Sequence, residues 1–182
     1  MALIYIVRHG KAAAGFTDNA DPGLDELGRS QAEAAANALT QFLPLNIVSS
    51  PLLRAQETAQ PFAAQTGQSV TIESRIAEIP SPGLSLTDRG PWLQAVMAGH
   101  WSEQSADLQS WRRSLQQCLL EVSEDTVMFS HFVAINTALG LATNSDQVML
   151  TRPDNGSITV LNNGQGVLSL VTKGVEASTK VN

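Results

Sequence analysis

The sequence is poor in cysteine and in charge. Its 182 residues include one cysteine, Cys118, and 15% charged residues. A single cysteine cannot form an internal disulfide, and without partner thiols it cannot build a thiolate metal site. The apolar start, Met1 to Val7, is too short for a secretory signal and meets Arg8 directly. No stretch approaches the roughly 20 apolar residues of a membrane span, so we expect a cytoplasmic protein that does not bind membranes.

Positive charge is scarce, with 11 Lys and Arg against 17 Asp and Glu and a formal net charge of −6. Binding to nucleic acid needs many cations that face phosphates, so no nucleic-acid partner is expected. Hydrophobic residues make up 43% of the chain, which is a globular composition. At about 150 residues per domain, the length predicts a single domain over 1–182. The sequence leaves the oligomeric state open.

Short apolar segments alternate with helical patterns along the chain. Strands are predicted at Leu3–Val7, Leu45–Val48, Ser69–Ile72, Val127–Phe129, Ser157–Leu161 and Gly166–Val171. Helices are predicted between them, with start signals at Asp25, Ser50 with Pro51, Ser105 and Phe132, and with stop signals at Pro44 and Gly67. This alternation predicts an α/β fold, a three-layer sandwich with a mostly parallel central sheet and helices on both faces.

Residues 74–104 depart from this regular pattern. Long elements there are interrupted by Pro80, Pro82, Gly83, Gly90 and Pro91. Thr87 can cap a short helix that reaches Met97. We expect this segment to be an excursion over the active site and to set substrate specificity. The tail from Glu176 is expected to be frayed.

Histidine and arginine side chains follow the ends of predicted strands. Arg8 and His9 come directly after the first strand, His131 follows the strand that ends near Phe129, and Arg54 lies in the opening turn of the second helix. In open α/β sheets the ligand crevice lies beyond the carboxyl ends of the strands. These four side chains can therefore converge on one crevice.

Such a set of side chains suits a phosphoryl group. Guanidinium groups match phosphate oxygens bidentately, and a neutral imidazole can attack phosphorus while fixed cations stabilise the charge. A carboxylic acid must protonate the leaving alkoxide, and Glu78 is placed to do so, with Glu73 and Asp88 as alternatives. No His, Asp and Glu cluster shows metal-ligand spacing, so neither a metal nor a cofactor is expected.

In order along the chain, the sequence resembles the histidine phosphatase (phosphoglycerate mutase-like) superfamily, in its small first branch. The segments that carry the resemblance are Arg8-His9-Gly10, Leu24–Ala32, Ser49–Ala59, Ile76–Ile79, Phe129–His131 and Asn155–Ile158. The resemblance implies a phosphoglycerate mutase-like fold with His9 as the transiently phosphorylated nucleophile. It also implies that Arg8, Arg54 and His131 bind the phosphoryl group and that Glu78 is the proton donor.

The chain departs from larger members of that family near the site. Its first loop reads Lys11-Ala12-Ala13-Ala14, the stretch after Glu78 is rich in proline, and Phe132 stands where many relatives have glycine. An open site favours hydrolysis over mutase action, which needs a closed cavity. We therefore expect a metal-independent phosphomonoester phosphatase of the histidine acid type. Alternatives are phosphoglycerate mutase activity, protein phosphohistidine phosphatase activity and non-enzymatic sensing of a phosphorylated ligand.

The substrate is accordingly expected to be a phosphorylated small molecule or a phosphoprotein. Arg152 and Lys11 could reach an anionic substrate, but each is more typical of a solvated charge. His100 is interpreted as a surface residue and Cys118 as a buried, inert thiol. Core or edge packing is predicted for Trp92, Trp101 and Trp111.

Overall fold

The helices and strands of the computed structural model, which describes residues 1–15, 18–81 and 83–177, follow one another in α/β order. In chain order they are β1 (Leu3–Arg8), α1 (Glu26–Leu39), β2 (Asn46–Ser49), α2 (Leu53–Thr66), β3 (Thr71–Ile72), α3 (Leu86–Ala98), α4 (Ala106–Glu121), β4 (Thr126–Ser130), α5 (Phe132–Thr143), β5 (Ile158–Asn162) and β6 (Ser169–Thr172). Short 3-10 turns lie at Thr40–Phe42, Ser74–Ile76, Trp101–Glu103 and Gly164–Gly166.

The strands form one sheet in the order β3-β2-β4-β1-β5-β6. Strands β1, β2, β3 and β4 pair in parallel, whereas β5 runs antiparallel to β1 and β6 antiparallel to β5. The carboxyl ends of β2, β4 and β1 are therefore neighbours, and the antiparallel β5 begins at that same edge. The predicted fold class, a mostly parallel sheet between helices, is confirmed.

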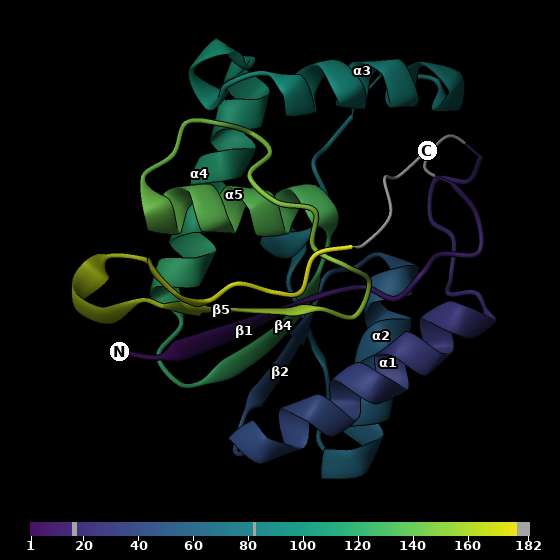
Figure 1. The fold of residues 1–182 in the computed structure, drawn as a ribbon, viewed down its shortest axis with the longest axis vertical. Coiled ribbons are helices and arrows are strands. Elements are labelled where there is room, and N and C mark those ends of the chain that lie inside the picture. Colours follow the sequence, from purple (N-terminus) through teal and green to yellow (C-terminus); the bar gives the residue numbers. More distant parts are fainter. Residues whose placement is uncertain (16–17, 82, 178–182) are drawn as a thin grey trace.

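Helices cover both faces of this sheet (Figure 1). Successive strand side chains point to opposite faces, so in β1 Ile4 and Ile6 pack on one side while Tyr5 and Val7 pack on the other. Helices α1 and α2 cover the Tyr5 side, and α4 and α5 cover the Ile4 side. Helix α3 lies away from the sheet, at the top of the view.

The start of α2 differs from the predicted one. The sequence indicated Ser50 as the N-cap and Pro51 as the first helical residue, but α2 begins at Leu53 and its N-cap, Leu52, makes no side-chain cap. Ser50 continues the direction of β2 because its N–H donates to the carbonyl of Phe129 (3.0 Å). The Ser50 hydroxyl accepts the Leu52 N–H (3.2 Å), and its own proton is left for another partner, which lies in the candidate site.

A short helix from a Thr87 cap to Met97 was predicted, in a segment where Gly90 and Pro91 were expected to break any long element. The helix α3 is present, but the predicted cap was wrong. Ser85 is the N-cap, with its hydroxyl accepting the Asp88 N–H, and the helix runs for 13 residues through Gly90 and Pro91. Pro91 is exposed, so water can satisfy the Thr87 carbonyl that has no proline N–H to bind. Of the other predicted breakers, Pro82 lies outside the described residues.

The C-terminal part also differs from the prediction. The last strand begins at Ser169 rather than Gly166, because Gln165 and Gly166 both have positive φ angles, 58° and 73°, and form a turn. Glu176 is not frayed. It forms a β-bridge with Pro153, and its carboxylate binds the Thr151 hydroxyl and the Lys173 ammonium. Residues 178–182 of the predicted frayed tail lie outside the described residues.

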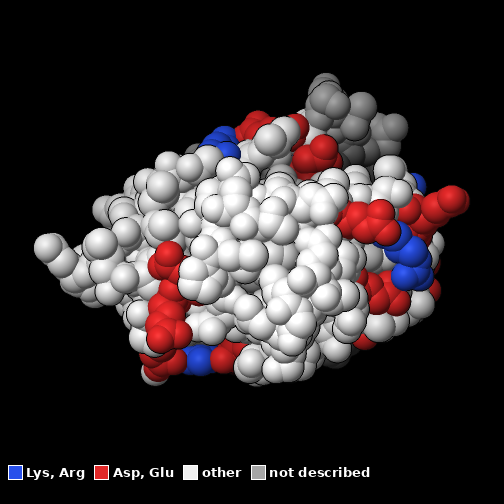
Figure 2. Space-filling model, turned by 90° about the horizontal axis from the view of Figure 1, so that it is seen from below, with Lys and Arg blue, Asp and Glu red and all other residues white. Residues whose placement is uncertain are grey.

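One broad face of the molecule carries little charge. Figure 2 shows an uncharged centre with charged side chains at the margins. In the sequence, residues 34–53 and 58–72 contain no Lys, Arg, Asp or Glu, and these stretches include the second halves of α1 and α2. Among the described residues no helix is both long enough and apolar enough to cross a bilayer.

Candidate active site

Two histidines lie side by side at the carboxyl edge of the sheet. Arg8 at the end of β1 is in register with Ser130 at the end of β4, so the next residues, His9 and His131, are brought together. Their ring centroids lie 5.2 Å apart, and both side chains are buried. Arg54, in the first turn of α2, places its Nε 3.2 Å from His9 Nε2. The structure thus brings together three of the side chains that the sequence assigned to one crevice.

The hydrogen bonds of His9 determine which ring nitrogen carries the proton. Its Nδ1 lies 2.7 Å from the carbonyl oxygen of Gly10, which can only accept. The proton therefore lies on Nδ1, and the lone pair of Nε2 accepts the Nε–H of Arg54. Burial, aided by the charges of Arg54 and Arg8, lowers the pKa of His9 from 6.5 to about 3. His9 is accordingly a neutral imidazole with its basic nitrogen directed at Arg54.

Ser50 forms a hydrogen bond with the second histidine, His131. Its Oγ lies 2.7 Å from His131 Nε2 and accepts the Leu52 N–H (3.2 Å), so its own proton can go to His131. That arrangement leaves the His131 proton on Nδ1, an atom that is buried and has no hydrogen-bond partner among the described residues. Burial, followed by the charges of its neighbours, keeps the pKa of His131 well below its usual value. His131 can therefore offer an N–H to an incoming oxygen.

Arg8 is fixed by a carbonyl and an aromatic ring. Its NH1 donates to the Pro153 carbonyl (2.8 Å), and its guanidinium carbon lies 5.1 Å from the centre of the Phe132 ring. Burial lowers the pKa of Arg8, but an arginine side chain stays charged in proteins. Phe132 follows His131 directly, so its ring lies near the site as the sequence indicated. The pair amounts to a cation–π contact that limits where the guanidinium can point.

The carboxylate of Glu78 lies at the N-terminal end of α5. It accepts the N–H groups of Val133 (3.0 Å) and Ala134 (3.3 Å), and also that of Ile79 (3.1 Å). Burial raises the pKa of Glu78, although Arg54 and these N–H groups oppose the shift. A half-buried carboxyl with a raised pKa, beside two arginines and a histidine, is a candidate proton donor.

The two alternative carboxylates do not belong to this site. Glu73 forms an ion pair with Arg75 (2.7 Å) in another part of the molecule. Asp88 is exposed and lies at the start of α3, where its carboxylate accepts the Ser85 hydroxyl (2.5 Å). Of the carboxylates weighed from the sequence, Glu78 is thus the one that lines the cavity with His9 and both arginines.

Two further polar residues support the loop that carries His9, and neither was predicted to belong to the site. Asn155 donates its side-chain N–H to the His9 carbonyl (2.8 Å). Thr58 accepts the Gly10 N–H (3.0 Å) while donating to the Arg54 carbonyl (2.6 Å), which couples β1 to α2. Gly10 has to be glycine, because a Cβ there would lie 2.3 Å from the Gly28 carbonyl oxygen.

These groups line a cavity of about 880 Å³. Its lining includes Arg8, His9, Arg54 and Glu78, together with Lys11 and Arg152. Both of the latter had been interpreted as solvated charges. They are exposed, and Lys11 forms an ion pair with Asp25 (2.9 Å). Helix α3 contributes Leu93, Gln94, Met97 and Ala98 to the same cavity.

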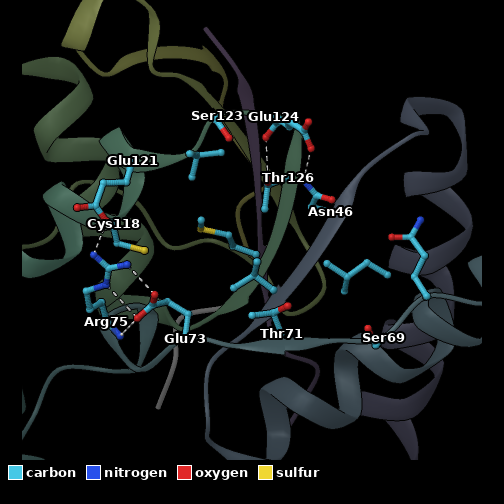
Figure 3. A pocket seen from close by; sticks show the side chains of 15 residues that line it. Asn46, Ser69, Thr71, Glu73, Arg75, Cys118, Glu121, Ser123, Glu124 and Thr126 are labelled. Carbon is cyan, nitrogen blue, oxygen red and sulfur yellow. Dashed lines mark hydrogen bonds and ion pairs between the residues drawn. The ribbon is translucent and has the colours of Figure 1, made fainter.

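A second hollow of about 710 Å³ lies along β2 and β4 beside the end of α4 (Figure 3). Its charged groups bind one another, since Arg75 contacts Glu73 (2.7 Å) and Glu121 (2.6 Å). Cys118, also in its lining, is mostly buried, and burial raises the pKa of its thiol to about 11. The hollow therefore presents an inert thiol and carboxylates that are already paired, not an assembled set of catalytic groups.

Sequence comparison places this site in a known class of proteins. The profile of the histidine phosphatase superfamily (branch 1) matches residues 4–175. The chain belongs to this family, as the resemblance of its motifs predicted. The match includes both histidines and both arginines of the candidate site.

Individual relatives carry phosphatase and mutase names. A glucosyl-3-phosphoglycerate phosphatase from Mycolicibacterium vanbaalenii is 40% identical over 79 residues, which are 41% of this chain and 35% of that protein. The chain thus matches about a third of the length of this relative. A probable phosphoglycerate mutase from Erwinia tasmaniensis is 27% identical over 175 residues, covering 84% of this chain and 81% of that protein.

The fold recurs in solved structures. The phosphoserine phosphatase of Entamoeba histolytica, in complex with 3-phosphoglyceric acid, superimposes with a TM-score of 0.76. The identity is 22%, and the match covers 98% of each chain. The two folds therefore agree over almost the whole length of both chains.

Proposed function

We propose that the chain is one histidine phosphatase domain over 1–182 and that it hydrolyses phosphomonoesters without a metal, through a phosphohistidine on His9. One observation carries the proposal: a neutral His9, whose Nε2 lone pair accepts the Arg54 Nε–H at 3.2 Å, lies beside a second buried imidazole. A lone pair held among fixed cations suits attack on a phosphoryl group.

In the first half-reaction, His9 Nε2 forms a bond to phosphorus while the bond from phosphorus to the ester oxygen breaks. Arg8, Arg54 and the Nδ1–H of His131 bind the phosphoryl oxygens and stabilise the charge that develops on them. The contact of Arg54 with His9 gives way to the phosphoryl group. The Nδ1–H bond to the Gly10 carbonyl keeps the ring oriented throughout.

Glu78 supplies and recovers the proton. Protonated Glu78 donates to the leaving oxygen, so an alcohol rather than an alkoxide departs. A water molecule then attacks phosphorus, the Glu78 carboxylate takes the proton of that water, and the bond between phosphorus and Nε2 breaks. Inorganic phosphate leaves, and both His9 and Glu78 return to their starting protonation states.

The shape of the cavity favours a phosphorylated small molecule over a phosphoprotein. Residues 74–104 contribute Glu78 and the cavity-lining residues of α3 to the lining. We therefore propose that this segment covers the site and limits access to it. The volume of about 880 Å³ is in the range of small-molecule sites. Two of the relatives named above are phosphatases of small phosphorylated carboxylates.

Mutase activity is a second candidate, because a relative that matches 84% of this chain is a probable phosphoglycerate mutase. A mutase would return the phosphoryl group to substrate faster than to water. Incubation with 3-phosphoglycerate, followed by phosphorus NMR, separates the two reactions. Release of inorganic phosphate supports the phosphatase, whereas 2-phosphoglycerate formed ahead of phosphate supports the mutase.

The proposal is tested by hydrolysis of 4-nitrophenyl phosphate, with and without EDTA. We expect turnover that is insensitive to the chelator and that falls at least about 10³-fold in His9→Ala, since the nucleophile is lost. His100→Ala is the matched control, because His100 is an exposed histidine that pairs with Glu103 outside the cavity. Normal turnover in His9→Ala would overturn the proposal.

A further inference from the structure

The cavity over His9 is lined by polar side chains and by large apolar ones, which differ in exposure. At its base lie His9 and Arg54, both buried and charged or polar. At its mouth lie Asn19, Gln94 and Arg152, all exposed. The lining also contains apolar side chains, which differ from these polar ones.

Four half-buried side chains of this lining are large and apolar, and we call them the middle layer: Leu93, Met97, Phe132 and Met149. Polar side chains of the same lining are half-buried too: Arg8, Asp25, Glu78 and Asn155. Leu93 and Met97 are four residues apart and therefore lie on one face of α3, whereas Phe132 starts α5 and Met149 belongs to the following loop. Leu93, Met97 and Phe132 pack against the same buried cluster, so separate segments bring apolar side chains together in the cavity.

The opposite wall offers little polarity to a ligand either. Ala12, Ala13 and Ala14 line the cavity after Lys11. The Lys11 ammonium lies 2.9 Å from Asp25, whose other carboxylate oxygen accepts the Gly28 N–H (2.7 Å), so both charges have partners. Against these alanines and the middle layer, a polar alcohol portion would lose water without gaining hydrogen bonds, which is costly, whereas an apolar portion would gain from burial.

Phe132 joins the base to this layer. Its ring contacts the Arg8 guanidinium at 5.1 Å and also lines the cavity. A phosphoryl group held by Arg8 therefore has its ester oxygen next to an aromatic ring. The first atoms of the alcohol portion would meet apolar surface.

We propose that this middle layer, formed by Leu93, Met97, Phe132 and Met149, is a subsite for an apolar alcohol portion, so that the preferred substrates are phosphate monoesters of aryl or arylalkyl alcohols. This inference rests on the proposed phosphatase function and deepens it. The cavity volume leaves room beyond a phosphoryl group for a ring-sized substituent.

The test compares 2-phenylethyl phosphate with glycerol 3-phosphate, two primary alkyl esters whose leaving alcohols differ chiefly in polarity. We expect kcat/KM to be at least about tenfold higher for the phenylethyl ester, mainly through KM. In Leu93→Gln/Met97→Gln this preference should fall about tenfold, while hydrolysis of the glycerol ester stays unchanged. Ala95→Gln is the matched control, since Ala95 is exposed on α3 and does not line the cavity.

Equal or better hydrolysis of the glycerol ester by the natural chain would overturn the subsite, as would a double variant that keeps the full preference. Should the double variant fold poorly, Met149→Gln replaces it. If the natural chain hydrolyses neither ester, the phosphatase proposal fails, and the subsite is judged by calorimetry with two phosphonates. Binding of 2-phenylethylphosphonate about tenfold tighter than 2,3-dihydroxypropylphosphonate supports the subsite, and equal binding overturns it.

Discussion

The base of the cavity and its apolar middle layer are built in opposite ways. The base rests on strand ends: His9, His131 and Ser50 follow three adjacent strands, and each has a hydrogen bond to a neighbouring segment. The middle layer consists of half-buried side chains from a helix, a helix start and a loop. A sheet edge can fix reacting groups tightly because several strands determine it, whereas an excursion can change its lining without disturbing the chemistry.

This difference predicts separate kinetic effects. Changes in the base should lower kcat for every substrate, and changes in the middle layer should alter KM for apolar substrates only. If a variant at the base of the cavity affected only one substrate class, it would contradict this distinction between the two regions.

The largest of the remaining effects is expected for Glu78→Gln. Without the acid, kcat for 2-phenylethyl phosphate should fall about 10²- to 10³-fold, but 4-nitrophenyl phosphate, with its good leaving group, should lose less than about tenfold. The raised pKa of Glu78 means that its proton is present at low pH and lost as pH rises through that pKa. The alkyl ester should therefore show a falling alkaline limb, which disappears in Glu78→Gln.

If Glu78 only supported the start of α5, both esters would be affected equally and the melting temperature would drop. Glu73→Gln serves as the comparison variant, since Glu73 pairs with Arg75 away from the cavity. Equal losses for both esters in Glu78→Gln would exclude an acid at this position.

A smaller effect is expected for Ser50→Ala. Loss of the hydroxyl leaves His131 Nε2 without its donor, so the ring no longer holds the proton on Nδ1. We expect kcat/KM to fall about tenfold, the equivalent of roughly 1.4 kcal/mol for one buried hydrogen bond. Ser50→Thr should restore the rate, and Ser49→Ala, one residue away, should not lower it. A shift of the pH profile in Ser50→Ala alone would identify a positioning role, and an unchanged rate would contradict it.

A further effect concerns stability in acid. The unfolded chain binds a proton at His9 below pH 6.5, but the folded chain does not until about pH 3. The free energy of unfolding should therefore fall with decreasing pH through this window, by about 1.4 kcal/mol per pH unit from His9 alone. Urea denaturation at several pH values should give a shallower fall in His9→Gln. Identical slopes would show that His9 is protonated in the folded chain.

The sequence predicted those site residues whose position depends on strand ends. Arg8, His9 and His131 follow apolar runs that were recognisable as buried strands, and the parallel pairing of β1 with β4 places them together. Ser50 was misinterpreted because Ser-Pro before a helix is also a capping signal. Only the backbone pairing of Ser50 with Phe129 distinguishes the two.

The surroundings of the site depended on contacts that no local pattern records. Asn155 reaches His9 from a position 146 residues further along the chain, and Thr58 reaches Gly10 across 48 residues. The apolar middle layer combines α3, α5 and a loop. At α3, the sequence predicted a slightly shorter helix with a different N-cap. Such features come from tertiary packing, which overrides local propensity.

The central claim is that His9 carries the phosphoryl group during turnover. Its most direct test is to quench the reaction with 4-nitrophenyl phosphate within milliseconds in alkali and to map the bound phosphate by mass spectrometry. The account predicts a phosphate on the peptide that contains His9, stable in base, labile in acid and absent from His9→Ala. Rapid turnover with no phosphate on His9, or with phosphate on another residue, would contradict it.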